Sequence, residues 1–330
     1  MKVLMYTKVY NGEKTLARTI ESVLNQTYTN FDYYILDNGS TDNTRAIIEA
    51  YRAIDQRIKV ISNETNNIHA LLDFDKLMRT IPTPRLYEYF ALVDADDTYH
   101  PDFLEKTINY SLLYDLDICA VGSVFINSYT GQEMDKRKLN YNIRMETPQE
   151  WDMLFPYFYQ FVMPVWAKLF KMDTVILQMT YEKGVKEKII NGVDTYFCIR
   201  ALLACQRFGV LSDICHTYYV GAGSAYHTYY PNRVYGYHLI NEGVKEFLIQ
   251  KVGEVSEINR IHMYSTLINN VAAVLFAVRN EPLEIKIENY NQLMEIEDVK
   301  TVRTRVFKGA QDKYIQNLVN QMMEGIENEM

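Results

Sequence analysis

Short apolar runs alternate with helix-patterned segments in the first hundred residues, and this alternation restricts the folds open to the chain. Four runs are expected to be buried strands: residues 2–6, 31–36, 58–61 and 89–93. Between them, apolar residues recur three and four positions apart, as in Leu16, Ile20 and Val23. Strands that alternate with helices favour a mostly parallel sheet covered by helices on both faces. The predicted fold class is therefore α/β.

The fourth apolar run ends in three carboxylates, Asp94, Asp96 and Asp97. Asp94 and Asp96 are two positions apart, so on an extended chain both side chains would point in the same direction. That spacing suits one hard divalent cation held by oxygen ligands, with substrate phosphates completing its coordination shell. A solvated acidic turn that caps the next helix, with Asp97 as the capping residue, explains the same residues. The pattern alone leaves both interpretations open.

Charge and motifs exclude several classes of function. The 330 residues carry a formal net charge of −8, which argues against general nucleic-acid binding. No GxGxxG follows the first strand and no GxxxxGK[ST] occurs, which disfavours dinucleotide-binding and P-loop folds. The four cysteines show neither CxxC pairing nor histidines at ligand spacing, so they are expected to be buried thiols in a reducing compartment.

The sequence shows no recognisable targeting signal, and the protein is therefore expected to be cytoplasmic. The N-terminus lacks the apolar region of a signal peptide, and the apolar run at residues 271–278 is too short to span a bilayer. Peripheral contact with the inner face of the membrane stays an open alternative. After Asn232 the pattern is helical, over residues 234–252 and 258–278 and then two segments broken near Pro282 and Gly309. These helices are candidates for self-association, partner docking or acceptor binding.

Three separated motifs resemble the family 2 glycosyltransferases of GT-A fold. They are VYNGEKTLARTIESVLNQTYTNFDYYILDNGSTDNT, then ALVDADDTYHPDFL, and more weakly VWAKLF and NGVDTYF. The resemblance implies a Rossmann-like catalytic domain over residues 1–230 that binds a nucleotide sugar. Residues 231–330 would form a helical C-terminal extension.

The resemblance implies that two loops hold the base and ribose of the sugar donor. The first contains Val9, Tyr10 and Asn11, and the second contains Asp37 and Asn38. Tyr10 offers a flat face for a base, although a packed loop aromatic is the alternative, and Asn11 is also a candidate N-cap of the first helix.

Two further segments contain candidate donor contacts. Asn67 and Lys76 are candidates in the first, which an ordinary amphipathic helix explains equally well. In the second, a glycine-serine loop, Gly223 and Ser224 could donate backbone N–H groups to the diphosphate. His227 in that loop is a candidate metal ligand, but a lone histidine is more often structural.

The resemblance makes Asp94-Ala95-Asp96 the metal motif. Asp96 is expected to bind Mn²⁺ or Mg²⁺, and Asp94 to face the ribose or a metal-bound water. Because no lysine or arginine lies nearby in the sequence, the metal is the expected source of positive charge for the departing diphosphate.

Asp194 matches the family's catalytic base, although an aspartate in a first helical turn is also an ordinary cap. Burial would raise the pKa of Asp194 and the helix N-terminus would lower it, and the sequence does not decide between them. Trp166 is open to two interpretations, a face for a sugar ring or a core side chain.

The function expected from this resemblance is inverting, metal-dependent transfer of a sugar. The donor would be a nucleoside-diphosphate sugar, with UDP expected, and the acceptor a hydroxyl of a glycan or lipid-linked precursor. The first alternative is a non-catalytic nucleotide-sugar or glycan-binding module of the same fold. The second is a nucleotidyltransferase, which the missing Gly-rich N-terminal loop disfavours. Homo-oligomerisation through the C-terminal helices is also open.

Overall fold

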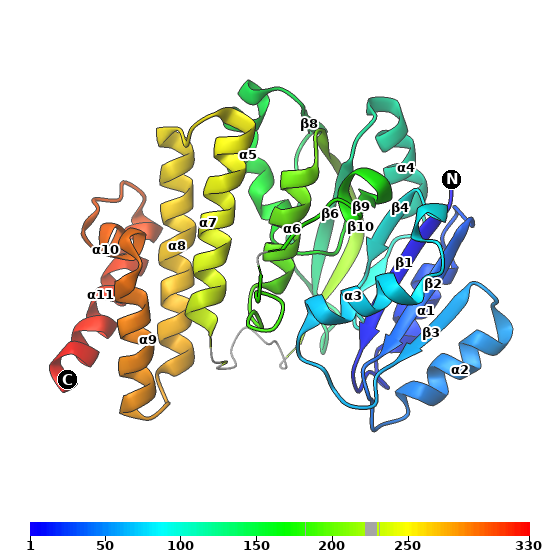
Figure 1. Cartoon of the computed structure of the whole chain (residues 1–330), viewed down its shortest axis with the longest axis horizontal. Coiled ribbons are helices and arrows are strands. Elements are labelled where there is room, and N and C mark those ends of the chain that lie inside the picture. The colour runs from blue at the N-terminus through cyan, green and yellow to red at the C-terminus, as the bar shows by residue number, and fades with distance from the viewer. Residues whose placement is uncertain (182, 222–229, 231) are drawn as a thin grey trace.

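One ten-stranded sheet forms the centre of the part of the chain that the computed structural model describes, residues 1–181, 183–221, 230 and 232–330 (Figure 1). The strand order is β3-β2-β1-β4-β9-β6-β10-β5, with β7 beside β6 and β8 beside β10. The strands are β1 (Val3–Val9), β2 (Phe31–Asp37), β3 (Ile58–Ser62), β4 (Tyr89–Leu92), β5 (Thr98–Tyr99), β6 (Ile118–Asn127), β7 (Glu133–Arg137), β8 (Ile143–Met145), β9 (Lys168–Lys171) and β10 (Phe208–Val220).

The first four strands form the expected parallel unit. β1 pairs in parallel with β2 and with β4, and β2 pairs in parallel with β3. The register places Val9, the last residue of β1, opposite Asp37, the last residue of β2. The carboxyl ends of these strands therefore meet at one edge of the sheet, where open α/β folds bind ligands.

Beyond β4 the sheet is mixed, so the expectation of a mostly parallel sheet describes only its first half. β9 runs antiparallel between β4 and β6, whereas β6 and β10 are parallel. β5, β7 and β8 pair antiparallel with their neighbours. The short turn between β6 and β7 permits only antiparallel pairing, because parallel strands need a long crossover connection.

Helices cover both faces of the sheet, as expected. One face carries α1 (Leu16–Leu24), α2 (Thr44–Ile54) and α4 (Phe103–Tyr114); the other carries α3 (Ala70–Thr80), α5 (Pro148–Val162) and α6 (Val193–Ala204). Alternate residues of β1 enter the two cores, because successive side chains of a strand point to opposite faces. Two short helical turns, Pro84–Leu86 and Met172–Ile176, complete this part.

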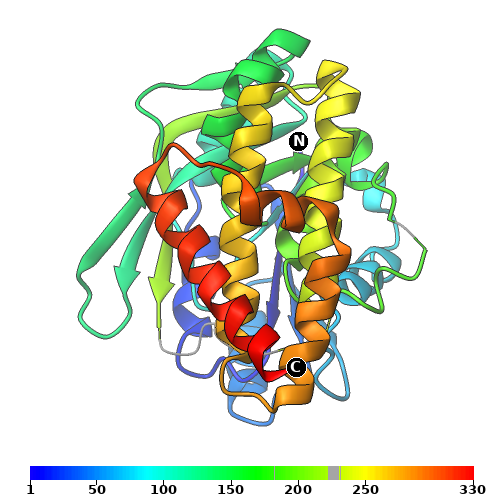
Figure 2. The same ribbon diagram turned by 90° about the vertical axis from the view of Figure 1, so that its left-hand side faces the viewer.

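Five helices after the sheet form a C-terminal helical region (Figures 1 and 2). They are α7 (Arg233–Val252), α8 (Glu257–Val278), α9 (Leu283–Glu295), α10 (Glu297–Thr304) and α11 (Ala310–Glu329). α7 packs on α6, and a separate apolar core joins α8 to the helices that follow. The first two helices confirm the sequence prediction, but the next segment is split at Ile296, whose extended backbone separates α9 from α10.

The apolar run at residues 271–278 belongs to a longer helix, α8. By length and composition this helix could cross a membrane, and half of its most apolar stretch is buried inside the fold. Its buried side chains, Leu267, Ile268 and Val271 among them, belong to the C-terminal core. The core helix of a folded domain passes the same test of length and composition.

Candidate functional site

A tight turn follows β4 and holds the three carboxylates. The backbone N–H of Asp97 donates to the carbonyl oxygen of Asp94 (3.1 Å). Helix α1 fixes this turn, since Thr19 Oγ1 donates to the carbonyl of Asp97 (2.8 Å) and the Arg18 guanidinium to that of Asp96 (2.6 Å). Because the chain turns directly after the strand, Asp94 and Asp96 line two different cavities. Each of the two cavities thus receives one carboxylate of the predicted metal pair.

Asp94 and Asp194 line the smaller cavity, which has a volume of about 110 Å³. Lys8 lies on the same wall, and the remaining lining is mostly apolar: Leu71, Phe74, Phe90, Leu92, Val165, Val193 and Phe197, with Tyr6. Asp194 sits in the first turn of α6, two residues after the left-handed cap residue Gly192 (φ 75°). The fold thus brings Asp94 of the predicted metal motif and the predicted base to one cavity.

The two carboxylates in this cavity influence each other's protonation. Burial raises the pKa of Asp94 well above its ordinary value, and the negative charges of Asp194, Asp97 and Asp96 raise it further. Burial also raises the pKa of Asp194, whereas Lys168 lowers it. Asp194 is an exposed residue, so water reaches its carboxylate and weakens the effect of burial on its pKa.

Lys168 is a buried cation next to this pair. Its ammonium donates to the carbonyl oxygens of Pro164 and Trp166, the latter at 3.3 Å. Burial lowers the pKa of Lys168 to about 8, so the side chain is still mostly charged at neutral pH. Its positive charge lies close enough to favour the ionised form of Asp194.

Trp166 is a core residue and offers no free face to a sugar. Its exposed fraction is 6%, and its ring stacks on His216 with 4.4 Å between centroids. Tyr218 lies on the same indole at 5.4 Å. Of the two interpretations that the sequence left open, the structure therefore supports packing.

Asp97 does not cap the helix that follows, because it is buried beneath the turn. The cap position of α4 is Asp102. Asp97 Oδ1 accepts from the backbone N–H of Tyr219 (2.9 Å), and Oδ2 lies 3.5 Å from His216 Nε2. Burial raises the pKa of Asp97 to about 8 and lowers that of His216 well below its usual value. Both changes favour a protonated carboxyl beside a neutral imidazole.

Asp96 faces the larger cavity, of about 740 Å³, together with Asn11, Lys14, Arg18 and Tyr219. The Arg18 guanidinium lies 3.4 Å from the centroid of the Tyr219 ring. Arg18 of α1 and Lys14 of the loop before it lie far from Asp96 in the sequence, so no motif connects them to it. The fold therefore adds two cations where the sequence suggested that only a metal would be positive.

The first donor loop is tied to the turn after β2. Asn11 adopts a left-handed conformation (φ 52°), and its side-chain oxygen accepts from the backbone N–H of Thr41 (2.8 Å). Asn11 therefore links two loops and does not cap α1, whose cap position is Thr15. Tyr10 is 45% exposed, whereas the Val9 side chain is buried and its carbonyl accepts from Asn38 N (2.8 Å).

Asn38 is buried in a network of asparagine side chains. Its Oδ1 accepts from Asn63 Nδ2 (2.7 Å) and Asn67 N (3.0 Å), while its Nδ2 donates to the carbonyl of Asn67 (2.9 Å) and to Asn66 Oδ1 (2.6 Å). The side chain of Asn38 thus orders the loop that follows β3. Its neighbour Asp37 is also buried and accepts from Ser40 N (3.0 Å).

Lys76 and Lys8 support the same network from outside. Lys76 Nζ donates to Asn63 Oδ1 (2.5 Å), and Lys8 Nζ pairs with the buried Asp73 (2.6 Å) and donates to the carbonyl of Asn67 (2.8 Å). The predicted donor residues Gly223 and Ser224, and His227, lie outside the described residues.

The residues present fit a divalent cation that substrate phosphates would help to hold. Within the described ranges, no three His, Cys, Asp or Glu side chains gather into a metal site. Asp94 and Asp96 supply two carboxylates, and Mg²⁺ is commonly bound by one or two carboxylates plus phosphates. The repulsion that raises the pKa of Asp94 marks an excess of negative charge, which a cation would relieve.

Comparison with known proteins places this chain in a family. The sequence model described as Glycosyl transferase family 2 matches residues 6–171, about half of the chain. A Haemophilus influenzae protein described as an uncharacterized glycosyltransferase is 37% identical over 114 residues, which are 34% of this chain and 33% of that protein. The chain covers between 33% and 42% of the length of this and the two curated relatives that follow it.

Two solved structures show the same fold. A crystal structure of S. aureus TarS 1-349 in complex with UDP-GlcNAc has a TM-score of 0.58 and 17% identity, and the match covers 92% of this chain and 90% of that one. The mannosyltransferase PcManGT from Pyrobaculum calidifontis, in complex with GDP-Man and Mn²⁺, has a TM-score of 0.51 and 11% identity, over 97% and 85% of the two chains. The expected GT-A architecture with a C-terminal helical region is thereby confirmed.

Proposed function

This chain belongs to glycosyl transferase family 2, and on that premise we propose that it is an inverting, metal-dependent enzyme that transfers one sugar. The donor is a nucleoside-diphosphate sugar, with UDP as the nucleotide, and the acceptor is a hydroxyl of a glycan or lipid-linked precursor. One observation supports this proposal most strongly: Asp94 and Asp194 line one cavity beside the turn that carries Asp96. UDP-GlcNAc in TarS and GDP-Man with Mn²⁺ in PcManGT support a nucleotide-sugar donor and a metal.

Asp194 is the proposed general base. A sugar hydroxyl is a poor nucleophile at neutral pH, so a base within hydrogen-bonding reach must accept its proton as the new bond forms. Such a base contributes roughly 10²–10⁴ to the rate. Burial makes the Asp194 carboxylate more basic than an ordinary aspartate, while Lys168 keeps it from being protonated too readily. The net effect is a raised pKa, and a raised pKa makes the carboxylate a stronger proton acceptor.

The opposite side of the turn serves the leaving diphosphate. Asp96, with Asp94, would hold a divalent cation, which when bound offsets negative charge on the departing nucleoside diphosphate. Arg18 and Lys14 line the same cavity as Asp96 and provide fixed positive charge for the phosphates. Tyr10, exposed at the end of β1, provides an aromatic face for the base.

Release of the nucleoside diphosphate from a panel of UDP- and GDP-sugars, with and without Mn²⁺, tests this proposal. The wild-type protein is expected to release UDP from at least one UDP-sugar in a Mn²⁺-dependent manner. Asp96→Asn should lose Mn²⁺-dependent UDP binding in calorimetry while its melting temperature stays near that of the wild type. Full UDP affinity and turnover in Asp96→Asn would refute the metal assignment. Nucleotide-sugar binding without turnover under all conditions would instead indicate a binding module.

A further inference from the structure

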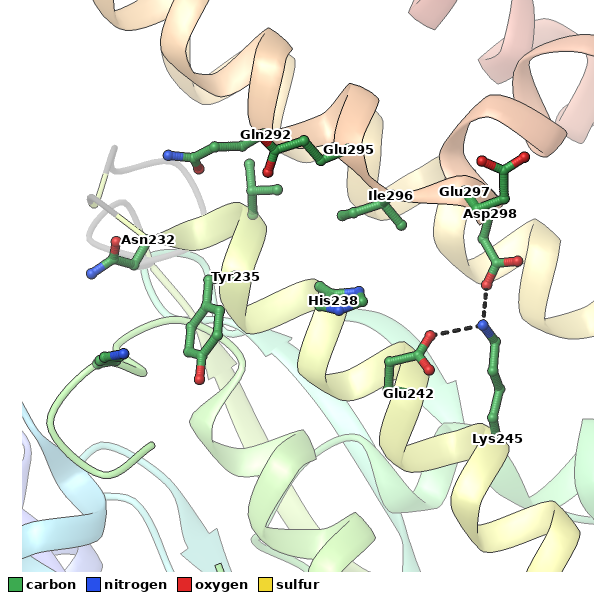
Figure 3. A pocket seen from close by; sticks show the side chains of 12 residues that line it. Asn232, Tyr235, His238, Glu242, Lys245, Gln292, Glu295, Ile296, Glu297 and Asp298 are labelled. Carbon is green, nitrogen blue, oxygen red and sulfur yellow. Dashed lines mark hydrogen bonds and ion pairs between the residues drawn. The ribbon is translucent and has the colours of Figure 1, made fainter. Parts of the chain in front are cut away.

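A second cavity of about 740 Å³ lies in the C-terminal helical region, apart from the carboxylate turn (Figure 3). One face of α7 forms one wall, through Asn232, Tyr235, His238 and Glu242, and the junction of α9 and α10 forms the other. Lys188, from the loop before α6, also lines it. We propose that this cavity is the acceptor groove, and that it binds a saccharide without carboxylate, sulfate or phosphate groups. This inference rests on the proposed glycosyl transfer.

The walls suit a ligand rich in hydroxyl groups. Amide, imidazole and carboxylate side chains surround the space, and these can both donate to and accept from sugar hydroxyls. Tyr235 projects from α7 with Lys188 Nζ 5.9 Å from the centroid of its ring, and it adds an aromatic side chain, the kind of group on which the C–H face of a sugar ring packs. The volume lies in the range of about 300–1,000 Å³ typical of small-molecule sites.

The charge of the lining argues against an acidic saccharide. Four carboxylates, Glu242, Glu295, Glu297 and Asp298, line the cavity with two lysines, and Glu297 also pairs with Lys300 (3.1 Å). One of the two lining lysines, Lys245, is already paired with Glu242 (2.7 Å) and Asp298 (2.5 Å), as Figure 3 shows. Glu295 is exposed and forms no ion pair with any residue that the structure describes. An anionic sugar would therefore meet an excess of like charge.

The groove is connected to the proposed base through α7. On the side of α7 that faces α6, Gly236 lies so close to Asn191 that a Cβ would stand 2.6 Å from the Asn191 carbonyl oxygen. Ile240 of α7 also contacts Gly192, which precedes the first turn of α6, because its Cδ1 lies 2.5 Å from where a Cβ would stand. One helix therefore contacts both the groove and the turn that carries Asp194, and a helix with its side chains is only about 10–12 Å across. The groove and the turn that leads to Asp194 therefore lie on two sides of the same helix.

The extent of the family match supports a role for this cavity in acceptor choice. The family model ends at residue 171, so α7, α9 and α10 lie beyond the matched region. Nucleotide recognition is assigned to the matched half. A cavity built entirely from the remainder is where this chain can differ from its relatives in what it glycosylates.

Binding of the full-length protein to immobilised oligosaccharides tests the inference without requiring turnover. The uncharged probes are cellobiose, maltotriose and N,N′-diacetylchitobiose, and the acidic probes are sialyllactose and a glucuronic-acid disaccharide. We expect retention of at least one uncharged probe, weakened at least tenfold by Tyr235→Ala. Tyr314→Ala, at an exposed tyrosine of α11 outside the groove, is the matched control and should bind as the wild type does. If Tyr235→Ala unfolds, Gln292→Ala on the opposite wall replaces it.

Three results would overturn the groove assignment: no uncharged probe retained, stronger retention of the acidic probes, or equal loss in Tyr235→Ala and Tyr314→Ala. Calorimetry with UDP separates this inference from the proposed function. UDP affinity unchanged in Tyr235→Ala, together with weakened glycan binding, supports an acceptor groove independent of the donor site. Glycan binding by a protein that binds no UDP would refute the proposed transfer but leave the groove in place.

Discussion

Asp94 and Asp194, which are 100 positions apart in the chain, line one small cavity, and the charge of Asp194 helps to raise the pKa of Asp94. Two carboxylates that repel each other in an apolar setting are costly unless a ligand uses them. Perturbed pKa values of this kind concentrate at functional sites. The pair therefore identifies the region of the sheet edge where chemistry is expected.

Replacing Asp194 by asparagine should abolish sugar transfer but not donor binding. The amide keeps the size of the side chain and removes its ability to accept a proton, so the rate should fall by at least about 100-fold. UDP affinity should change little, since Asp194 does not line the cavity of Asp96. Steady-state kinetics and calorimetry measure the two effects. Near-normal transfer would show that Asp194 only caps its helix.

Replacing Lys168 by methionine should move the acid limb of the pH–rate profile to higher pH. Transfer needs ionised Asp194, so activity falls as pH decreases through the pKa of Asp194. The positive charge of Lys168 lowers that pKa, and its removal should raise it. Lys171→Met, at the half-exposed end of the same strand, should leave the profile in place. A shift to lower pH in Lys168→Met, or no shift, would contradict this account.

Replacing Arg18 by alanine should weaken UDP binding in the presence of Mn²⁺ about tenfold. The guanidinium donates to the carbonyl of Asp96 and covers the Tyr219 ring, and hydrogen bonds from charged groups contribute about 1.5–3 kcal/mol. Its loss should loosen the turn and remove positive charge from the cavity. Arg52→Ala, which breaks an exposed pair with Glu49 on α2, is the control and should have no effect.

Replacing Asp97 by asparagine should stabilise the protein more at pH 9 than at pH 5. The folded-state pKa of Asp97, about 8, lies above the ordinary aspartate value, so its stabilising protonation is present in acid and is lost as pH rises through 8. Asparagine stays neutral and can still accept from Tyr219 N. Thermal unfolding at both pH values gives the comparison, and a variant whose advantage shrinks as pH rises would refute the assignment.

Replacing Gly236 by alanine should lower both stability and transfer rate. An added Cβ would stand 2.6 Å from the backbone oxygen of Asn191, and overpacking of this kind costs about 1–3 kcal/mol. The displaced turn carries Asp194. Gly325→Ala in α11 meets nothing within 4 Å, so it should instead stabilise the protein by roughly 0.5–1 kcal/mol, the usual helical preference for alanine. Equal melting temperatures for the two variants would contradict the close contact.

The strands and helices that build the sheet edge could be predicted because their periodicity is local. The four expected strands of the parallel unit and the helices α7 and α8 lie within a few residues of their expected bounds. The mixed half of the sheet could not, because β9 is a four-residue strand whose pairing depends on distant neighbours, β4 and β6. The break at Ile296 could not be predicted either, because no glycine or proline stands there.

The site residues that stand in a motif could be predicted from the sequence. The contacts that arise only from packing could not. Asp94, Asp96 and Asp194 stand in recognisable segments, and the fold gathers them around one turn. The burial of Trp166 and Asp97 depends on His216, which comes from β10, a strand that no motif connects to them. Arg18 reaches Asp96 only because α1 packs beside the turn, a contact that helix periodicity alone does not specify.

The close packing of α7 against the turn before α6 limits where segments can be exchanged between members of the family. Gly236 has no room for a side chain because the Asn191 backbone occupies the space, and Gly192 has a left-handed backbone (φ 75°) with Ile240 of α7 against it. A chimaera joined at residue 231 would pair a foreign helix with the resident turn and place unmatched side chains at both contacts. Recombination upstream of Lys188 transfers the turn, α6 and the groove wall together. Acceptor preference in this protein is therefore expected to be inherited as a unit that begins inside the catalytic half.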